Sequence, residues 1–250
     1  RKVNNQSTKG LFAITVDDGY NNTIPRLCDI CIEKGWPITF YPLIDFLDGK
    51  IMIWLLLQNL KKILKGHTIS IAGKQKDFKK RKILEATFDQ LQLKIYTLQK
   101  KEYMHIIDSI IESIIDNNIA QMDELYNQPK SITWDFVEEK SKNELISFQS
   151  HGVTHMPVIA LSNEKIEKEC VKSKKRISDV TGKKVNHFCF PFGNNQSIGK
   201  KAPMIIAKHF DSAVTMNRGR IDKANIYMLP RIPLYNKDSK GRTLLKQITY

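Results

Sequence analysis

Short apolar runs alternate with amphipathic stretches near the start of the chain. Residues 11–16 form an apolar run rich in β-branched side chains at its end, and residues 38–43 form a second run. Between them, residues 23–34 place apolar side chains at helical spacing, and Gly35 and Pro37 follow as helix-ending signals. This order of strand, helix and strand predicts a βαβ unit with parallel strands and a right-handed crossover.

The same alternation of strands and helices is predicted again beyond residue 130. Ser162 is a typical N-cap residue at the head of a long polar helix. The predicted elements of this half are helices at 134–142, 162–180 and 202–209 and strands at 145–149, 185–190, 212–215 and 227–229. Together with the βαβ start they predict an α/β protein. A length of 250 residues fits one domain of this class, so we expect a single domain over residues 1–250.

The middle of the chain has a different pattern. Residues 50–127 are rich in Lys, Ile and Leu, with candidate helices at 52–64, 80–100 and 102–117. The last candidate carries a wide apolar stripe of isoleucines, at positions 106, 107, 110, 111, 114 and 115. Such a stripe indicates packing rather than cofactor binding. We therefore expect a helical insertion over residues 50–127.

Composition and charge narrow the class of protein. Hydrophobic residues make up 41% of the chain, which is enough for a real core and excludes a disordered protein. The net charge of +14 reflects either a lysine-rich solvated surface or attraction to an acidic polysaccharide, a membrane surface or nucleic acid. No zinc-finger spacing, RNP-like motif or helix-turn-helix signature is visible, so no nucleic-acid partner is expected. The most apolar run, residues 51–57, is too short to cross a membrane.

The four cysteines do not suggest a disulfide framework, because they are few and scattered. Cys28 and Cys31 form a CxxC pair on the apolar face of the predicted helix at 23–34. A structural zinc site would need a second pair, and none follows. We expect these two thiols to lie in the core.

Side chains with catalytic chemistry follow predicted strands, where the active sites of parallel α/β proteins gather. Asp17 and Asp18 form either an ordinary turn or a pair in which one carboxylate binds a metal ion and the other handles a proton. His151 and His155 are either two loop histidines or two ligands, since a spacing of four puts both on one face of a helical turn. With Asp18 they would form a two-histidine, one-carboxylate set that leaves room for water and substrate.

Two further motifs complete the pattern. Phe-Pro-Phe-Gly at residues 190–193 ends a strand and is either a simple turn or a source of backbone N–H groups for an oxyanion. Leu-Pro-Arg-Ile follows at residues 229–232. In this order the motifs resemble those of the polysaccharide deacetylase family, the NodB-homology or carbohydrate esterase family 4 group. The four resembling segments are residues 15–20, 150–155, 187–193 and 229–232, within a resemblance that covers about residues 10–49 and 130–233.

The resemblance implies a fold, a reaction and a substrate class. The fold would be a distorted (β/α) barrel with fewer than eight full units. The reaction would be metal-dependent hydrolysis of acetyl groups from N-acetylated amino sugars of a polysaccharide or glycan precursor. The partner would therefore be a carbohydrate, with the positive charge favouring an acidic polysaccharide. The location, a bacterial cytoplasm or cell envelope, is left open, and no signal peptide is visible in this sequence.

The resemblance also assigns roles to individual residues. Asp18, His151 and His155 would bind the metal ion. Asp17 would act as the general base toward the attacking water, and the backbone N–H of Phe192 would help to hold the oxyanion. Zn²⁺ is the expected ion, and Co²⁺ or Ni²⁺ can occupy similar nitrogen and oxygen sites.

Two positions depart from the family pattern. Cys189 stands where many members carry an arginine that steadies the base, and Arg231 stands where many carry a histidine that protonates the leaving amine. Arginine stays protonated and is a poor general acid, so Arg231 would instead pair with Asp17 or support the oxyanion. The proton donor is left open between His187, which is otherwise a core histidine, and a metal-bound water, and Asp211 would either orient another group or act as a cap.

Other functions remain compatible with these motifs. The same fold supports an O-acetyl esterase, and the two departures favour a catalytically weak glycan-binding protein. The hypothesis of a basic protein that binds nucleic acid or a membrane surface is supported by the net charge alone. The insertion would either shape the glycan groove or make an oligomer contact, and the oligomeric state is open.

Overall fold

The computed structural model describes residues 12–71, 73–97, 100–219, 221 and 225–234. β1 (Ile14–Asp18) and β2 (Ile38–Pro42) pair in parallel and are joined by α1 (Ile24–Lys34). Gly35 ends α1 in the left-handed conformation that glycine adopts without strain. The predicted βαβ unit is therefore confirmed, with the strand shifted so that both aspartates belong to its end.

Parallel pairing continues around the molecule. β2 pairs with β5 (Ile146–Phe148), and β6 (His187–Cys189) pairs with β7 (Ser212–Val214). Two single parallel bridges extend this order, one between Ser150 and Phe188 and one between Val214 and Leu229. The chain thus builds a curved, open series of parallel segments, as expected for a distorted barrel with fewer than eight units. The strand predicted at 227–229 shrinks to the bridge at Leu229.

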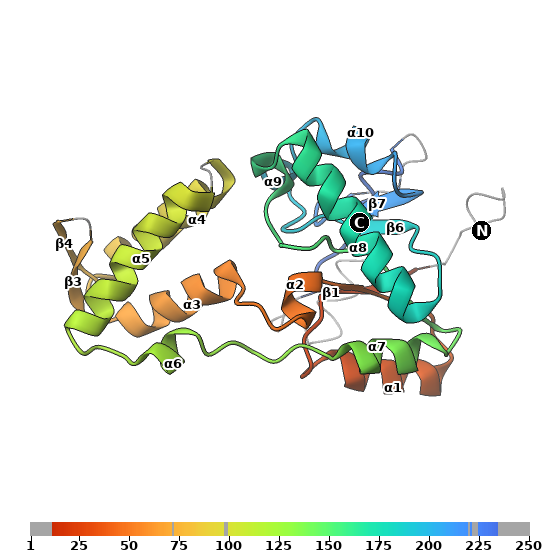
Figure 1. Cartoon of the computed structure of the whole chain (residues 1–250), viewed down its shortest axis with the longest axis horizontal. Coiled ribbons are helices and arrows are strands. Elements are labelled where there is room, and N and C mark those ends of the chain that lie inside the picture. The colour runs from red at the N-terminus through yellow and green to blue at the C-terminus, as the bar shows by residue number, and fades with distance from the viewer. Residues whose placement is uncertain (1–11, 72, 98–99, 220, 222–224, 235–250) are drawn as a thin grey trace.

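Helices cover the outside of this series (Figure 1). α7 (Trp134–Ser141) precedes β5, and α8 (Asn163–Thr181) joins β5 to β6. The Ser162 hydroxyl accepts a hydrogen bond from the Lys165 N–H, which confirms the predicted N-cap. The short elements of this half are a 3₁₀ turn at Val158–Ala160, α9 (Asn195–Ile198) and α10 (Ala202–Ile206). Cys28 and Cys31 are free thiols inside the main core, as predicted.

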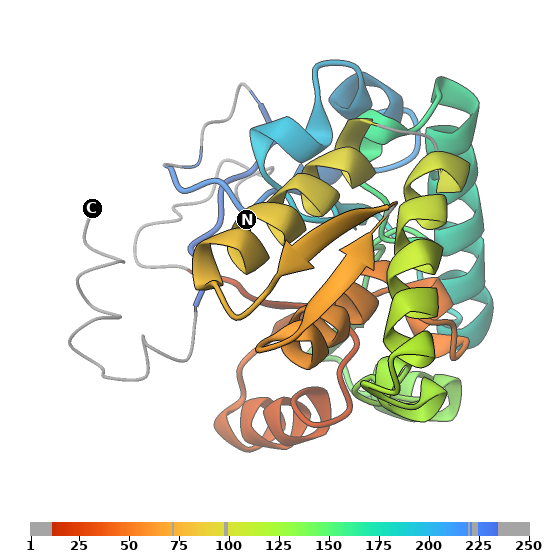
Figure 2. The same ribbon diagram turned by 90° about the vertical axis from the view of Figure 1, so that its left-hand side faces the viewer.

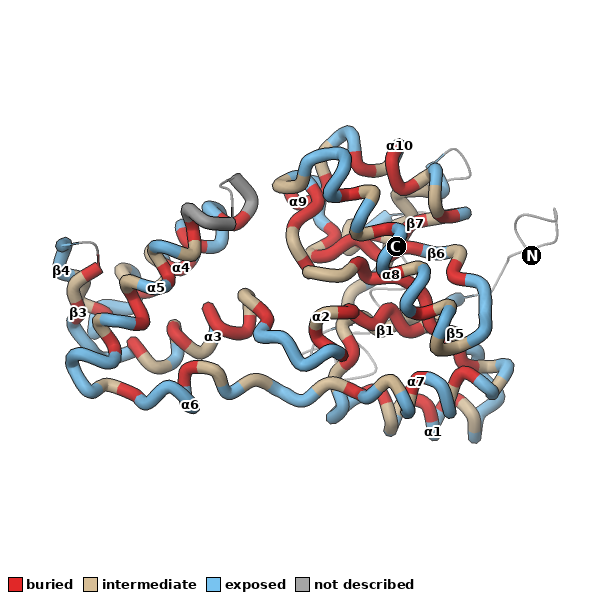
Figure 3. Tube along the Cα trace, viewed as in Figure 1, coloured by how far each residue is buried: buried red, intermediate tan, exposed pale blue. Residues whose placement is uncertain are grey.

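The insertion stands beside the barrel as a separate arm (Figures 1 and 3). After the short α2 (Ile44–Leu47), the arm contains α3 (Ile53–Leu64), β3 (Thr68–Ile71), β4 (Lys74–Asp77), α4 (Arg81–Thr97), α5 (Lys100–Asp116) and α6 (Met122–Leu125). Its buried side chains form a hydrophobic cluster distinct from the main core. The three long helices are confirmed.

The wholly helical reading of the insertion is wrong at β3 and β4, which form an antiparallel hairpin (Figure 2). Thr68–Ile71 alternates polar and buried side chains, the period of a strand rather than a helix. Gly73, with a φ of 76°, occupies the turn. Four residues per strand are too short a signal to stand out between long helices.

Polar side chains tie the two ends of the insertion together. The Gln128 amide donates to the carbonyl of Lys50 at 2.9 Å and accepts from the Met52 N–H at 3.0 Å. Farther out, Tyr103 on α5 contacts the Met156 sulfur at 3.4 Å, so the insertion also meets the barrel at the loop after β5. Within the described residues, no helix combines the length and apolarity needed to span a membrane.

Candidate active site

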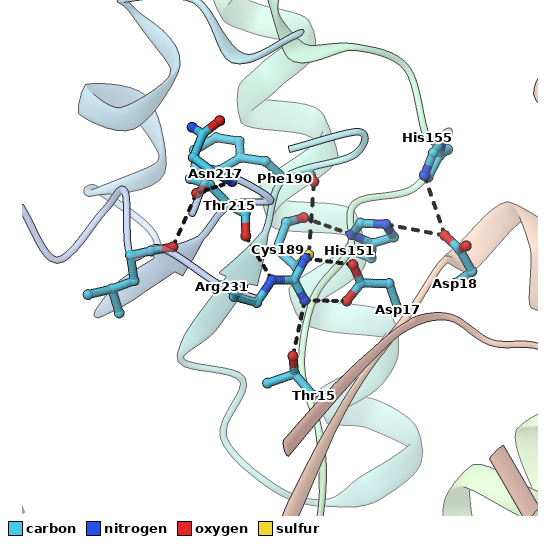
Figure 4. A network of polar contacts seen from close by, with 11 residues as sticks. Thr15, Asp17, Asp18, His151, His155, Cys189, Phe190, Thr215, Asn217 and Arg231 are labelled. Carbon is cyan, nitrogen blue, oxygen red and sulfur yellow. Dashed lines mark hydrogen bonds and ion pairs between the residues drawn. The ribbon is translucent and has the colours of Figure 1, made fainter. Parts of the chain in front are cut away.

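The predicted site residues meet at the carboxyl ends of the parallel strands (Figure 4). Asp17 and Asp18 end β1, and His151 lies just beyond β5. Phe192 follows β6, and Arg231 lies two residues beyond the Leu229 bridge. Parallel strands that share an edge can bring such distant parts of a chain together, here residues as far as 214 positions apart.

Asp18, His151 and His155 form a compact trio. The Asp18 Oδ1 atom lies 3.3 Å from His151 Nε2 and 3.4 Å from His155 Nε2. Both imidazoles are buried, and within the described chain this Oδ1 is buried without a properly aligned hydrogen bond. Ligand atoms about 2.1 Å from a tetrahedral ion lie roughly 3.4 Å from one another. The spacing and the orphaned oxygen therefore fit a divalent metal ion with an open fourth position.

The surroundings prepare these side chains as ligands. His151 Nδ1 contacts the Cys189 carbonyl at 2.8 Å, which fixes the ring and directs Nε2 toward Asp18. Burial alone would raise the pKa of Asp18, but the two imidazoles outweigh it and hold that pKa far below its ordinary value. Burial lowers the pKa of His155 and keeps the ring neutral. Burial would also lower the pKa of His151, but the neighbouring Cys189 and Asp18 outweigh it and raise that pKa well above the ordinary value. Because a metal ion binds ionised carboxylate and neutral imidazole, metal binding would release a proton from His151.

The predicted helical turn under the two histidines is wrong, because His151 and His155 lie on a loop. Their rings nevertheless approach edge to face, with centroids 5.0 Å apart. Glu169 on α8 holds the loop in place: its carboxylate accepts from the Val153 N–H at 2.5 Å, the Thr154 N–H at 3.1 Å and the Thr154 hydroxyl at 2.7 Å. A carboxylate from a neighbouring helix therefore replaces the helical hydrogen bonds that the spacing suggested.

Sequence reasoning missed Glu169, and no local signal marks it among the charged residues of α8. Gly152 is a weak signal elsewhere in the sequence. It has a φ of 80°, and a Cβ atom there would lie 2.9 Å from a Glu169 carboxylate oxygen. Glycine at this position is required both by the backbone conformation and by the close approach of Glu169.

Backbone strain gathers at the site. In the described residues, four non-glycine residues have a positive φ, and three of them are Asp18 at 71°, His155 at 54° and Phe192 at 60°. Each such conformation costs free energy and persists only where the surroundings enforce it. Two of the three are candidate ligands and the third is the candidate oxyanion donor. The fold therefore maintains strain where the chemistry is expected.

Arg231 pairs with Asp17 through two parallel hydrogen bonds of 2.7 and 2.6 Å. It also donates to the Thr15 hydroxyl at 3.1 Å and the Thr215 carbonyl at 2.8 Å, and it contacts the Cys189 sulfur at 3.1 Å. Of the two roles left open for Arg231, the pairing with Asp17 is the one the structure contains. The guanidinium of Arg231 thus holds the carboxylate of Asp17, the predicted base, and lies against the Cys189 sulfur.

This pairing controls the state of Asp17. Burial would raise the pKa of Asp17, but hydrogen bonds from Arg231 and the positive charge of His151 lower it below the ordinary value. Asp17 is therefore ionised at neutral pH and held in one orientation by the fork of the guanidinium. Arg231 itself stays protonated, which rules it out as a proton donor.

Phe192 lies in the turn after β6, and its ring packs edge-on against His155 with centroids 4.6 Å apart. The next residue, Gly193, has a φ of 61°, and a Cβ atom there would lie 2.7 Å from the Met216 nitrogen. The turn is therefore tightly determined. The oxyanion role of the Phe192 N–H stays a prediction.

The candidate proton donor His187 and the possible orienting residue Asp211 lie elsewhere. His187 is exposed at the start of β6 and contacts the Ser212 hydroxyl at 2.9 Å. Asp211 precedes β7, where its N–H donates to the Asn186 carbonyl. Neither residue lines the cavity in front of the metal trio.

That cavity has a volume of about 640 Å³ and lies between the strand ends and the insertion. The barrel contributes Asp17, Asp18, His151, His155, Phe190, Phe192 and Met216. The insertion contributes Trp54, Leu57, Gln58, Lys61, Phe88, Asp89, Gln92 and Ile95. The volume falls within the range of roughly 300–1,000 Å³ that is typical of ligand pockets.

Solved structures share this fold. The deacetylase PplD of Streptococcus pyogenes, solved with acetate, is 14% identical with a TM-score of 0.61, covering 100% of this chain and 75% of PplD. A de-N-acetylase from Aggregatibacter actinomycetemcomitans is 14% identical with a TM-score of 0.57, covering 98% and 78%. A polysaccharide deacetylase from Bacillus cereus is 14% identical with a TM-score of 0.56, covering 95% of this chain and 51% of that protein.

Sequence comparison gives the family directly. No curated protein matches the chain. Residues 76–202, which are 127 of the 250, match the family described as polysaccharide deacetylase. The matched range includes both histidines of the trio and the turn at 190–193. The chain therefore belongs to the polysaccharide deacetylase family.

Proposed function

We propose that this protein is a metal-dependent N-deacetylase that acts on N-acetylated amino sugars within a glycan chain. One observation carries the proposal. The trio of Asp18, His151 and His155 and the ionised base Asp17 face the same cavity, which is large enough for more than an acetyl group. Family membership supports hydrolysis of a polysaccharide acetyl group, and the names of two similar structures point to deacetylation at nitrogen and to acetate.

Asp18, His151 and His155 would hold the metal ion, with Zn²⁺ as our first choice for this donor set. When bound, such an ion lowers the pKa of a coordinated water toward ~7 and polarises the acetyl carbonyl. An amide needs both effects because it is a weak electrophile with a poor leaving group.

The protein's own residues supply the proton transfers and the positioning. Asp17 accepts the proton of the attacking water, and Arg231 keeps its carboxylate oriented while it does so. The Phe192 N–H stabilises the oxyanion. After attack, Asp17 carries a proton beside the reaction centre, so we assign it the return of that proton to the leaving amine. Acetate and a free amino sugar result.

The proposal is tested by measuring acetate release from N-acetylglucosamine oligomers by metal-free protein, Zn-loaded protein and Zn-loaded His151→Ala. His187→Ala is the matched control, because His187 lies outside the cavity. We expect acetate only from the loaded wild type and the His187→Ala variant. Equal release by the metal-free protein would overturn the metal site.

The same assay separates the alternatives. Release from O-acetylated sugars but not from N-acetylated ones would identify an O-acetyl esterase. Binding of oligomers with stoichiometric metal and no acetate release from either substrate class would identify a glycan-binding protein.

A further inference from the structure

We propose that the insertion is the part of the protein that recognises the glycan chain, with α3 and α4 binding the sugar units that flank the unit being deacetylated. This inference rests on the proposed function, because it assigns further contacts to the same substrate in the same cavity. Its starting point is that a single cavity has the metal trio on one side and these two helices on the other.

Each helix presents one continuous stripe to the cavity. On α3 the stripe consists of Trp54, Leu57, Gln58 and Lys61, and on α4 it consists of Phe88, Asp89, Gln92 and Ile95. The spacings of three, four and seven residues place each set on one face of its helix. Seven residues at ~1.5 Å per residue make each stripe about 10 Å long, which exceeds one pyranose ring. The two stripes together form a wall of the cavity, and this wall is long enough to contact more than one sugar unit.

The polar members of these stripes suit sugar hydroxyl and acetamido groups. Gln58, Asp89 and Gln92 are exposed, and within the described chain none of their side chains has a hydrogen-bonding partner. The two amides both donate and accept, and the carboxylate accepts, so together they match groups that also do both. Lys61 differs, because it already pairs with Glu85.

The apolar members suit the other aspect of a sugar, its C–H faces. Trp54 is half-buried and packs against His155 at a tilt of 35°, with ring centroids 3.9 Å apart, which places an aromatic side chain beside the candidate metal ligands. Leu57, Phe88 and Ile95 also reach the cavity, but they are almost completely buried in the insertion's own cluster. The two stripes therefore offer one partly exposed aromatic side chain, Trp54, beside exposed hydrogen-bonding groups, a combination that suits a chain of N-acetylated hexosamines.

The test compares a short and a long probe. We would measure kcat/KM for acetate release from the N-acetylglucosamine monomer and tetramer, using the wild type and the Gln58→Ala/Gln92→Ala double variant. The controls are Lys62→Ala and Gln90→Ala, which change exposed residues of the same helices that do not line the cavity. Two lost hydrogen bonds at ~1 kcal/mol each should reduce the tetramer-to-monomer ratio of kcat/KM about tenfold or more, mainly through KM. The control variants should keep the wild-type ratio.

Binding without turnover separates this inference from the proposed reaction. Calorimetry of the Zn-loaded Asp17→Asn variant with the tetramer should show affinity that the added Gln58→Ala/Gln92→Ala changes weaken about tenfold. If no oligomer releases acetate but this weakening occurs, glycan recognition by α3 and α4 is supported and the proposed reaction is wrong. If acetate is released and neither the tetramer-to-monomer ratio nor the affinity changes, the reaction is supported and recognition by these helices is wrong. Equal losses for monomer and tetramer would also overturn the wall.

Discussion

The barrel and the insertion treat their polar side chains in opposite ways. In the barrel, two side chains of the candidate site are held in place: Arg231 holds Asp17, and the Cys189 carbonyl holds the His151 ring. On the cavity face of the insertion, Gln58 and Gln92 are exposed and have no hydrogen-bonding partners in the described chain. Groups that must meet a reacting atom need a fixed geometry, whereas groups that bind a flexible glycan gain from being free to adjust. The reaction and the recognition are thus assigned to different regions.

Removing the base should have the largest effect. Asp17→Asn keeps the shape of the side chain but not its ability to accept a proton. We expect acetate release to fall by about 10²–10⁴-fold, as is typical for loss of a general base. Metal content, measured by elemental analysis, should stay stoichiometric because Asp17 is outside the ligand trio. Turnover comparable to the wild type would remove Asp17 from the mechanism.

A cavity in the insertion should affect stability but not the metal site. Ile110 is fully buried in the insertion's own cluster, and Ile110→Ala should lower the free energy of unfolding by ~2–5 kcal/mol. Ile115→Ala, at an exposed position on the same helix, should change it by less than ~0.5 kcal/mol. Denaturation followed by circular dichroism measures the free energy of unfolding. Titration with zinc measures the affinity of the metal site, which should not change. A parallel loss of zinc affinity would show that the two regions are not independent.

The loop that carries the histidines should depend on Glu169. Glu169→Gln retains the size of the side chain but weakens its hydrogen bonds to the loop. We expect zinc affinity to fall by ~10–100-fold, the usual cost of losing a group that orients ligands. Glu167→Gln is the control on the same helix, because Glu167 pairs with His209 and Lys208 away from the site. Equal affinity of both variants would show that the loop holds its own shape.

The smallest effect is expected where the two regions touch. Trp54→Ala removes the ring that packs at a tilt against His155. Loss of this contact, worth ~0.5–1.5 kcal/mol, would reduce zinc affinity by a few fold. Trp54→Phe retains an aromatic face and should restore most of the affinity. Titration of both variants with zinc gives the comparison. If neither differs from the wild type, the insertion contributes to substrate binding alone.

The elements that the sequence predicts best are those whose pattern lies within one short segment. The βαβ start, the N-cap at Ser162 and the long helices of the insertion each follow from local periodicity and end signals. The short hairpin β3–β4 does not, because each strand offers only four residues of pattern. Periodicity also misassigned the loop after β5, since a spacing of four between histidines is equally compatible with a strained loop.

The partners of the site residues were harder to predict than the residues themselves. Asp17, Asp18, His151 and His155 could be proposed from residue type and order along the chain. Glu169 could not, because its role depends on how α8 packs over a loop about 15 residues earlier. Arg231 was narrowed to two roles by its chemistry, and only the packing of its segment beside β1 selects the pairing with Asp17.

The Arg231–Asp17 pair also has a consequence for biosynthesis. The two residues are 214 positions apart, and they join the last parallel segment to the first. During translation, Arg231 is made 214 residues after Asp17, so the Asp17 carboxylate has no guanidinium partner until that stretch is complete. A chain interrupted within the stretch would lack the fork that orients Asp17 and helps to lower its pKa. Synthesis of the last parallel segment would thus have to precede orientation of the predicted base.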